Sequence, residues 1–365
     1  MTFLEYPYLL GYTVKKRCAL RNRKKLPCPV ISIGNLTLGG TGKTPAVMAL
    51  AQRAAVRGFY PCILTRGYRG KARGPCFVSR GEGAVLDPMQ AGDEAVLMAE
   101  ALPGIPIIKG SDRYRAGIFA LEDLKRRSPD SISEGRWFFI LDDGFQHWAL
   151  HRDKDVLLIN GMNPFGNGKL FPFGPLREPL SAMKRADLIV ITNTAEPCDD
   201  GSMSESETGK SDIGTALTRL QREIRQYAAN VPVYCAQHVP RFFLTLSGEA
   251  INLSEMRDKR VFAFCGIGNP LSFKSALRPL IGELTGFIIF RDHHQYGRAD
   301  VRQIAEHGKK TGADWIVTTE KDIMRLKRLP LPDRLLALRI EFRVDDGFYE
   351  EVFDFRRRAW SNISM

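Results

Sequence analysis

The chain contains 365 residues with a formal net charge of +12; 44% of them are hydrophobic and 26% are charged. The length favours two domains, the composition is that of a globular protein, and no apolar run reaches the roughly 18 residues that a membrane span needs. The positive charge indicates an acidic partner, which leaves nucleic acid, anionic lipid and phosphorylated substrates as candidates.

The first 25 residues place apolar and aromatic side chains before a cationic cluster. The apolar and aromatic residues are Phe3, Leu4, Tyr6, Tyr8, Leu9, Leu10 and Tyr12, and the cationic ones are Lys15, Lys16, Arg17, Arg21, Arg23, Lys24 and Lys25. This order is typical of an interfacial membrane anchor, with rings at headgroup depth and cations on acidic lipids. The alternative is a helix that packs on the protein body and leaves a solvated basic face. The segment lacks the features of a signal peptide, so we expect none.

A short β-branched run, a glycine-rich loop and a helical pattern follow one another after Pro29. Val30–Ile33 is predicted as a strand, and Thr44–Arg57 as a helix opened by a proline. The glycines let successive backbone N–H groups turn toward the phosphates of a nucleotide at a helix N-terminus. The predicted nucleotide-binding loop consists of Thr37, Leu38, Gly39, Gly40, Thr41, Gly42, Lys43 and Thr44.

Two side chains of this loop carry the expected chemistry. Lys43 would reach the β- and γ-phosphates, and the hydroxyl of Thr44 would bind Mg²⁺. Thr37 stands where the pattern G-x-x-x-x-G-K-[ST] has its first glycine. The alternative is a strand-to-helix turn with an incidental lysine, but the order of strand, loop and helix favours the nucleotide.

Further strands and helices alternate up to residue 141. Cys62–Thr65, Ile105–Ile108 and Trp137–Leu141 are nearly continuous apolar runs, which are typical of buried parallel strands. Asp93–Leu102 and Asp112–Leu124 have helical spacing. The alternation predicts an α/β fold with a parallel sheet and ligands at the carboxyl ends of its strands.

Acidic residues mark two points of this region. Asp142 and Asp143 end an apolar strand, which is the Walker B arrangement for holding Mg²⁺ directly or through water. An Asp-Asp-Gly turn without a metal is the alternative. Gln146 adds a polar group to the same loop. Asp93 begins a helix, where an acid either stabilises the helix N-terminus or serves as a catalytic base.

A second alternating series begins near Asp155. Its predicted strands are Val156–Ile159, Leu188–Thr192, Val261–Cys265, Phe287–Phe290, Trp315–Thr318 and Leu335–Phe342. We expect residues 1–150 to form one domain, to which residues 343–365 return through an amphipathic helix at Phe348–Trp360, and residues 151–342 to form a second, smaller α/β domain. Residues 196–215, rich in Ser, Asp, Glu and Gly, are predicted to be a surface insertion.

Two short motifs and the cysteines complete the inventory. Arg177 and Glu178 lie in a proline-framed segment that either binds phosphate or forms a surface turn. His293 follows a buried strand and is a ligand, a base or a structural histidine, while zinc is poorly supported because suitably spaced further ligands are missing. The seven cysteines are scattered and form no C-x-x-C, which favours buried thiols in a reducing cytoplasm over a disulfide frame or a zinc site.

Taken together, these motifs resemble one family, the tetraacyldisaccharide 4′-kinases of outer-membrane bacteria. The matching segments are Gly34–Pro45, Thr65–Tyr68, Gly92–Glu94, Asp112-Arg113, Leu141–His147, Gly174–Pro179, Cys265–Pro270, Asp292–His294 and Thr318–Asp322. They follow the family's order, and Thr37 is the family's own form of the loop. Arg69 departs from it, because the family often has glycine there.

The resemblance implies an ATP-dependent lipid kinase of lipid A biosynthesis. It would transfer the γ-phosphoryl group of ATP to the 4′-hydroxyl of a tetraacylated glucosamine disaccharide 1-phosphate. A P-loop domain and a smaller α/β domain would close over the nucleotide. The enzyme would be peripheral, on the cytoplasmic face of the bacterial inner membrane. The partners implied are the acylated lipid substrate and an anionic membrane surface, without nucleic acid and without an obligate protein partner.

The resemblance also assigns roles by position. Asp93 would be the base that accepts the hydroxyl proton, with His293 as its partner, and Lys43 and Arg113 would stabilise phosphoryl charge. Mg²⁺ would be held by Thr44 with Asp142 or Asp143. Gln146, Arg177 and Glu178 would lie near the nucleotide or the domain cleft. A kinase for a soluble or nucleic-acid substrate and a nucleotide-gated membrane-binding module remain the alternatives.

Overall fold

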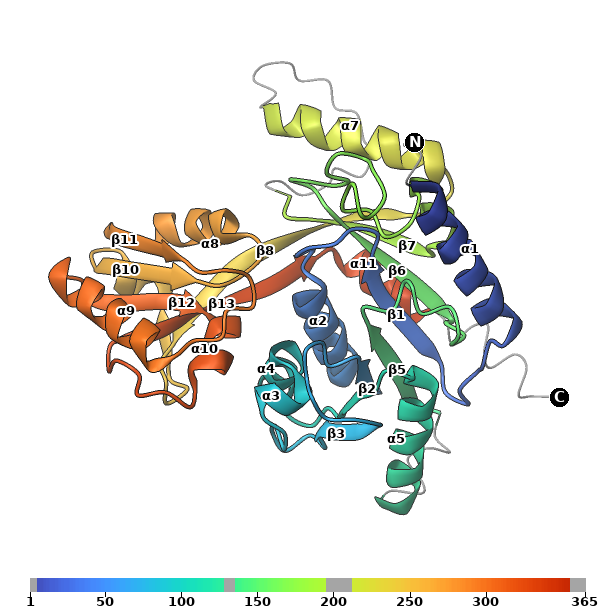
Figure 1. Cartoon of the computed structure of the whole chain (residues 1–365), viewed down its shortest axis with the longest axis horizontal. Helices are drawn as coiled ribbons and strands as arrows, with labels where there is room; N and C mark the ends of the chain where they lie inside the picture. The colour runs from blue at the N-terminus through green and yellow to red at the C-terminus, as the bar shows by residue number, and fades with distance from the viewer. Residues whose placement is uncertain (1–4, 128–134, 195–211, 355–365) are drawn as a thin grey trace.

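A computed structural model describes residues 5–127, 135–194 and 212–354 (Figure 1). Their strands join into one 13-stranded sheet whose order is β11-β10-β12-β13-β8-β7-β6-β1-β5-β2-β4-β3, with β9 paired to β8. Figure 1 shows this sheet divided into two lobes. The first lobe holds β1–β7 and the second holds β9–β12, while β8 and β13 run between them. The α/β architecture predicted from the sequence is confirmed.

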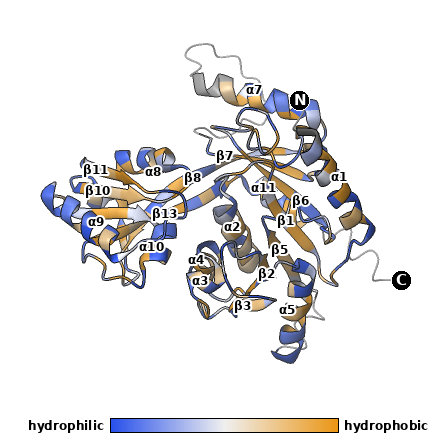
Figure 2. Cartoon of the chain, in the orientation of Figure 1, coloured by the Kyte–Doolittle hydropathy of each residue, from blue (hydrophilic) through white to orange (hydrophobic). Residues whose placement is uncertain are grey.

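The first lobe is built on parallel strands that are buried on both faces. From one side to the other they are β7 (Leu188–Thr192), β6 (Lys154–Asn160), β1 (Val30–Asn35), β5 (Trp137–Asp142), β2 (Tyr60–Thr65) and β4 (Ile107–Lys109), and β3 (Cys76–Ser79) is antiparallel at the edge. Its helices are α1 (Glu5–Arg21), α2 (Lys43–Val56), α3 (Pro88–Ala91), α4 (Asp93–Ala101), α5 (Arg113–Arg127), η1 (Leu180–Arg185) and α7 (Asp212–Tyr227). Helices on both faces explain why the strands read as nearly continuous apolar runs, which Figure 2 colours orange.

The second lobe has its own smaller sheet and helices. The strands are β9 (Ala250–Asn252), β10 (Arg260–Cys265), β11 (Glu283–Ile289) and β12 (Trp315–Thr319), and the helices are η2 (Leu253–Met256), α8 (Pro270–Leu277), η3 (Arg278–Leu280), α9 (Arg298–Lys310) and α10 (Glu320–Leu326). Two long strands, β8 (Val233–Leu244) and β13 (Leu335–Val344), join it to the first lobe. β8 is parallel to β7 at its start and antiparallel to β13 over most of its length.

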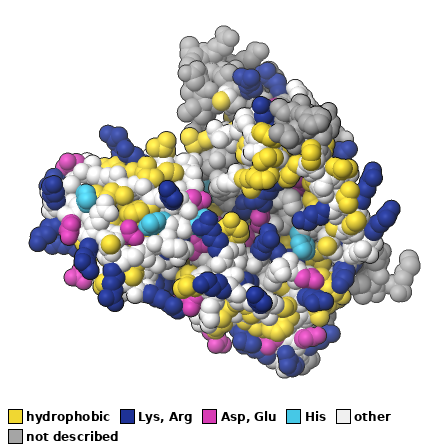
Figure 3. Space-filling model, in the orientation of Figure 1, with side chains coloured by type: hydrophobic (Ala, Val, Ile, Leu, Met, Phe, Trp, Pro, Cys, Tyr) yellow, Lys and Arg dark blue, Asp and Glu magenta, His cyan; other side chains and the backbone are white. Residues whose placement is uncertain are grey.

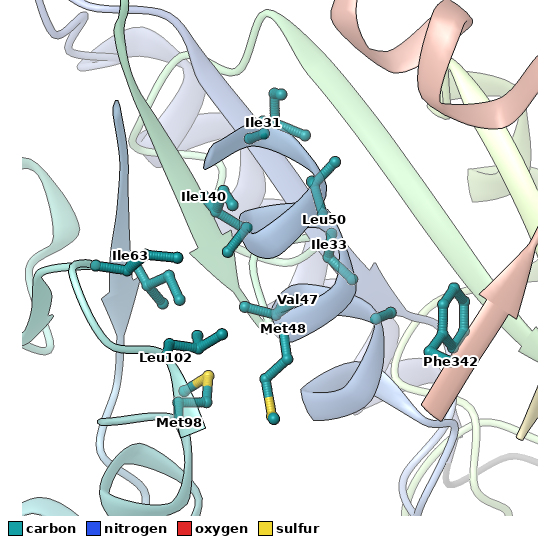
Figure 4. Close-up of a cluster of buried hydrophobic side chains, with 14 of the residues drawn as sticks. Ile31, Ile33, Val47, Met48, Leu50, Ile63, Met98, Leu102, Ile140 and Phe342 are labelled. Atoms are coloured by element: carbon teal, nitrogen blue, oxygen red, sulfur yellow. The ribbon is translucent and has the colours of Figure 1, made fainter. Parts of the chain in front are cut away.

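The core of the first lobe surrounds α2. Val47 and Leu50 of this helix are fully buried against Ile33 and Ile140 of the neighbouring strands (Figure 4). The same cluster takes in Phe348, Tyr349, Val352 and Phe353 of the last described helix, α11 (Asp346–Phe353). Helix α11 therefore packs into the core of the first lobe, and residues 355–365 lie outside the described part of the chain.

Three details differ from the sequence-based expectation. β6 pairs with β1, and β7 pairs with β6, so residues 154–192 lie in the first lobe and not beyond a boundary at residue 150. Strand–helix alternation continues across residue 150, and no feature of the sequence there marks a domain boundary. Residues 212–215 begin α7, while the rest of the predicted insertion, residues 196–211, is outside the described residues. Cys235 is disulfide-bonded, although Cys18, Cys28, Cys62, Cys76 and Cys265 are free thiols as predicted.

Helix α1 packs on the body with one face and leaves the other in solvent. Tyr12 contacts the ring of Trp148 edge-on at 5.3 Å and donates a 2.7 Å hydrogen bond to Oε2 of Glu178. Leu10 and Val14, in contrast, are 68% and 53% exposed. Figure 3 shows hydrophobic side chains gathered over α1 and the loops between β6 and β7. Among the described residues, no helix is long and apolar enough to cross a membrane.

Candidate active site

A cavity of about 1700 Å³ lies where the two lobes meet. The first lobe lines it with residues 38–44 of the predicted nucleotide-binding loop, with residues 65–69 at the end of β2, and with Asp142 and Asp143 at the end of β5. The second lobe contributes residues 267–269, Asp292, His293 and residues 319–321. The cavity thus lies at the carboxyl ends of the parallel strands, where ligands bind in α/β folds.

The nucleotide-binding loop connects β1 to α2 along one wall of this cavity. Gly42, directly before α2, has a φ of 79°, a left-handed conformation that suits glycine. Thr192 at the end of β7 donates a 3.0 Å hydrogen bond to the carbonyl of Thr41 and so holds the loop against the sheet. Lys43 Nζ lies 3.3 Å from Oδ1 of Asn35 and 3.6 Å from Oδ1 of Asp143. Thr37, the first of the eight predicted loop residues, does not line the cavity. It is buried and forms an isolated β-bridge with Leu176.

Asp142 and Asp143 are neighbours in sequence but differ in their surroundings. Asp142 accepts a 2.8 Å hydrogen bond from Oγ1 of Thr65, and burial, with the charges of Glu94 and Asp143, raises its pKa to about 6. Asp143 forms an ion pair with Arg177, whose Nη1 lies 2.9 Å and 3.0 Å from the two carboxylate oxygens. Burial alone would raise the pKa of Asp143, but the charges of Lys43 and Arg177 hold it below its usual range.

This difference bears on the predicted Mg²⁺ site. Mg²⁺ is usually held by one or two carboxylates together with water and substrate phosphates. Asp142 fits that role, because its carboxylate is buried with one hydrogen bond and resists ionisation until a cation compensates it. Asp143 is already compensated by Arg177 and Lys43. Within the described residues no group of three or more His, Cys, Asp or Glu side chains could hold a metal by itself.

Behind this part of the wall, Glu178 organises a buried polar cluster. Its side chain has no exposed surface and pairs with Arg185 at 2.5 Å. It accepts hydrogen bonds from Nε2 of Gln146 at 2.9 Å and from the hydroxyl of Tyr12. Gln146 and Arg177 line the cavity, whereas Glu178 does not. Glu178 therefore lies directly behind residues of the cavity wall, and its predicted place near the nucleotide or the domain cleft stays a prediction.

Arg113 is also buried behind the wall. Its Nη1 donates to the carbonyls of Gly110 and Ser111 at 3.2 Å and 3.1 Å, and its Nε is buried without a hydrogen-bond partner among the described residues. Burial lowers the pKa of Arg113, and the charge of Asp142 opposes that effect. Its predicted contact with phosphate stays a prediction.

The structure brings Asp93 and His293 together from different lobes. Asp93 is the first residue of α4 in the first lobe, and His293 lies in the loop after β11 in the second. Oδ2 of Asp93 lies 3.1 Å from Nδ1 of His293, although 200 residues separate the two along the chain. His293 has a left-handed φ of 59°, which is uncommon outside glycine and concentrates at functional sites.

Sequence reasoning missed two residues of this site. Arg325 of α10 is an ion-pair partner of Asp93, and only 2% of its side chain is exposed. The signal that could have identified Arg325 is its spacing of three residues from Asp322, within the helix that the motif Thr318–Asp322 begins. His238 of β8 lies against the nucleotide-binding loop, with Nδ1 2.6 Å from Oδ1 of Asn193. No sequence signal identifies His238, because β8 was not predicted as a strand.

A glycine-rich loop between a parallel strand and a helix, and an acidic strand end facing the loop lysine, define a P-loop kinase fold. The family model described as tetraacyldisaccharide-1-P 4′-kinase matches residues 4–356. The chain belongs to this family, which confirms the resemblance inferred from its motifs.

Relatives and a solved structure agree with this assignment. A tetraacyldisaccharide 4′-kinase of Syntrophus aciditrophicus is 37% identical over 91% of this chain and 85% of its own length. The enzyme of the same name from Geobacter sulfurreducens is 37% identical over 91% of this chain and 87% of its own. A crystal structure of LpxK from Aquifex aeolicus in complex with ATP superposes with a TM-score of 0.70, at 29% identity and over 96% of both chains.

Proposed function

We propose that this protein transfers the γ-phosphoryl group of ATP to the 4′-hydroxyl of a tetraacylated glucosamine disaccharide 1-phosphate. Family membership supplies the substrate class. The observation that carries the proposal is which side chains the two lobes place on opposite walls of the cavity. Lys43 and Asp142 mark where phosphates would lie, and His293, paired with Asp93, approaches from the opposite lobe.

The residues around the phosphates act by position and charge, which is what phosphoryl transfer mainly requires. Backbone N–H groups of residues 39–44 and the ammonium of Lys43 hold the β- and γ-phosphates. Thr44 and Asp142 hold Mg²⁺, which neutralises developing charge on the phosphate oxygens when bound. Arg177 fixes Asp143 beside Lys43 and so keeps the lysine directed into the cavity.

The same proposal places the protein at a membrane surface. A substrate with four acyl chains remains in a bilayer, so the cavity must be brought to it. Leu10 and Val14 are exposed apolar side chains of α1. Tyr8 of the same helix contacts a further exposed apolar side chain, Phe171, which is 46% exposed. Cations from Lys15 to Lys25 complement acidic headgroups. We place the protein peripherally on the cytoplasmic face of the inner membrane, where ATP is present.

A transfer assay with γ-labelled ATP tests the proposal. The acceptors are the tetraacyl disaccharide 1-phosphate in mixed micelles, water, and soluble glucosamine derivatives. We expect label in the lipid alone, at its 4′ position. Equal labelling of soluble sugars would instead favour a kinase for a soluble substrate. Nucleotide binding without transfer to any acceptor would favour a membrane-binding module.

A further inference from the structure

The β6–β7 loop, residues 161–176, is a compact turn that its own hydrogen bonds hold in shape. The backbone N–H of Phe171 donates to the carbonyl of Leu176 at 2.8 Å, and that of Phe173 donates to the carbonyl of Leu170 at 3.0 Å. Leu170 and Leu176 are buried in a hydrophobic cluster of the first lobe. The two phenylalanines are therefore carried on a turn of fixed shape that is anchored in the core.

The outer side of the β6–β7 loop is apolar. Met162 is 71% exposed and Phe173 is 40% exposed, and Phe171 is exposed as well. Lys169, also exposed, carries the only charge in residues 161–176. Unpaired backbone groups and acids are costly to bring into a lipid layer. Because the N–H groups of both phenylalanines are paired and the loop has no acid, these costs are small here.

Helix α1 lies directly beside this loop. The ring centroids of Tyr8 and Phe171 are 5.8 Å apart, and the hydroxyl of Tyr8 donates a 2.9 Å hydrogen bond to the carbonyl of Arg177. Leu10 and Val14, further along α1, are exposed too. Figure 3 shows hydrophobic side chains over α1 and over the loops between β6 and β7 in the same view. Two segments that are distant in sequence thus present apolar side chains on one face.

The β6–β7 loop is also fastened to the nucleotide-binding loop. The backbone N–H of Leu38 donates to the carbonyl of Pro175 at 2.7 Å, and that of Arg177 donates to the carbonyl of Leu36 at 2.7 Å. Leu38 is itself exposed, and both Leu38 and Met162 line the cavity. The apolar surface therefore extends to the edge of the cavity at the nucleotide-binding loop.

We propose that the β6–β7 loop enters the headgroup layer of an anionic membrane beside α1, as a second element of insertion. This rests on the proposed kinase function, whose substrate lies in a bilayer. Membrane affinity grows with the apolar area that is buried and with the attraction of cations, here Lys169, to acidic lipids. Because the loop is joined to α1 and to the nucleotide-binding loop, insertion turns the cavity edge at Leu38 and Met162 toward the lipid.

A second copy of this chain is the other occupant to compare with the membrane. In a symmetric dimer the same patch meets itself, so Lys169 and the cations of α1 would be brought toward their own copies. Acidic lipids instead neutralise that charge. The charge around the apolar surface therefore favours the membrane.

Fluorescence quenching by brominated lipid tests insertion of the loop without turnover. The Phe173→Trp variant and the wild type are mixed with vesicles of equal parts phosphatidylcholine and phosphatidylglycerol, with and without bromine on the acyl chains. We expect brominated lipid to quench the fluorescence that the substitution adds. Leu271→Trp on α8 is the matched control, because Leu271 is a 67% exposed apolar side chain of the second lobe, and its added fluorescence should remain. An unquenched Phe173→Trp variant would overturn the proposal.

Co-sedimentation with the same vesicles measures the share of binding that the loop supplies. Phe171→Asp with Phe173→Asp should lower the partition coefficient at least about 10-fold, since two rings leave the lipid. The loss should persist at high salt, where the attraction of cations fades. Leu246→Asp with Leu271→Asp, the same change at two exposed apolar positions of the second lobe, should bind like the wild type. Phe173→Asp alone, which keeps the contact between Phe171 and Tyr8, should show part of the loss.

Thermal melts show that the variants compared are folded. Wild-type partitioning of folded Phe171→Asp/Phe173→Asp would overturn the proposal. A lipid-free dimer in analytical ultracentrifugation that these two substitutions dissociate would overturn it too, and would assign the surface to a second copy. Absence of lipid phosphorylation by the wild type would refute the proposed function alone, because neither the quenching nor the co-sedimentation involves turnover.

Discussion

His238 on β8 lies directly against Gly42 of the nucleotide-binding loop. A Cβ atom on residue 42 would fall 2.5 Å from Cε1 and 2.6 Å from Nε2 of His238, which is closer than real Cβ atoms approach other atoms. The strand that joins the two lobes therefore fits closely against the loop that binds phosphate, and residue 42 has no room for a side chain.

We expect Gly42→Ala to weaken ATP binding at least about 10-fold, because the loop must shift to clear the imidazole. The double variant Gly42→Ala/His238→Ala should recover part of this affinity, leaving the smaller cost of a left-handed alanine, about 1 kcal/mol. Calorimetric titration with a non-hydrolysable ATP analogue measures both. If the double variant binds no better than Gly42→Ala, contact with His238 is not the cause.

His238 also makes the protein sensitive to acid. Burial lowers its pKa to about 4, against 6.5 for a free histidine. A histidine with a depressed pKa contributes stability that is present above pH 6.5 and lost as the pH falls toward 4, since the unfolded chain binds the proton first. Between pH 7 and pH 5, the free energy of unfolding of His238→Gln should therefore fall by about 2 kcal/mol less than that of the wild type. Urea unfolding at the two pH values gives the comparison, and equal losses would contradict the buried neutral state.

Lys43→Ala should abolish transfer with the fold intact. The ammonium lies at the cavity wall between Asn35 and Asp143, where it supports no core contact and is placed to neutralise phosphoryl charge. Loss of such a group costs several kcal/mol of barrier, so we expect kcat to fall at least about 10³-fold. A thermal melt within a few degrees of the wild type is the control. Retained turnover in the folded variant would refute the phosphate-binding role.

Substitutions of the two acids at the end of β5 should change the dependence of activity on Mg²⁺ in different ways. Asp142→Asn should raise the Mg²⁺ concentration for half-maximal activity about 10-fold or more, because this buried carboxylate forms no ion pair within the described residues. Asp143→Asn should act mainly on the KM for ATP, since it releases Arg177 and Lys43. Magnesium titrations of both variants at saturating ATP distinguish the roles, and the reverse pattern would make Asp143 the direct ligand.

For the membrane surface, point substitutions on α1 are sharper than removing the segment. Deleting residues 2–25 would also remove Tyr8 and Tyr12, whose hydroxyls bond to Arg177 and Glu178, and would destabilise the protein for that reason. Leu10→Asp with Val14→Asp changes exposed positions only and should weaken sedimentation with anionic vesicles while the melting temperature holds. Charge reversal at Lys15, Lys24 and Lys25 should weaken vesicle binding more at low salt than at high salt. Unchanged vesicle binding in all these variants would leave α1 a packing element alone.

Local sequence patterns were enough to predict the parts of the site that come from one continuous segment. The loop around Lys43 and the acids Asp142 and Asp143 lie where strand, glycine and helix patterns place them, because each depends on neighbours within a few residues. The pairing of Asp93 with His293 was accessible only through the family resemblance.

Arg325 and His238 escaped prediction for a physical reason. Their roles come from contacts with Asp93 and Gly42 across the two lobes, and nothing within one helix or strand encodes such a partner. The sequence also did not show that β6 and β7 continue the sheet on the β1 side, because a buried parallel strand has the same apolar pattern in either lobe.

The distance along the chain between Asp93 and Arg325 has a consequence for synthesis. Ribosomes add about 5–20 residues per second, so the 232 residues between the two take roughly 10–50 s to make. The nucleotide-binding loop leaves the ribosome early, whereas the guanidinium that fastens Asp93 leaves near the end, followed by α11, which completes the first core. A chain cut short before Arg325 therefore contains the complete nucleotide-binding loop but lacks the guanidinium that pairs with Asp93.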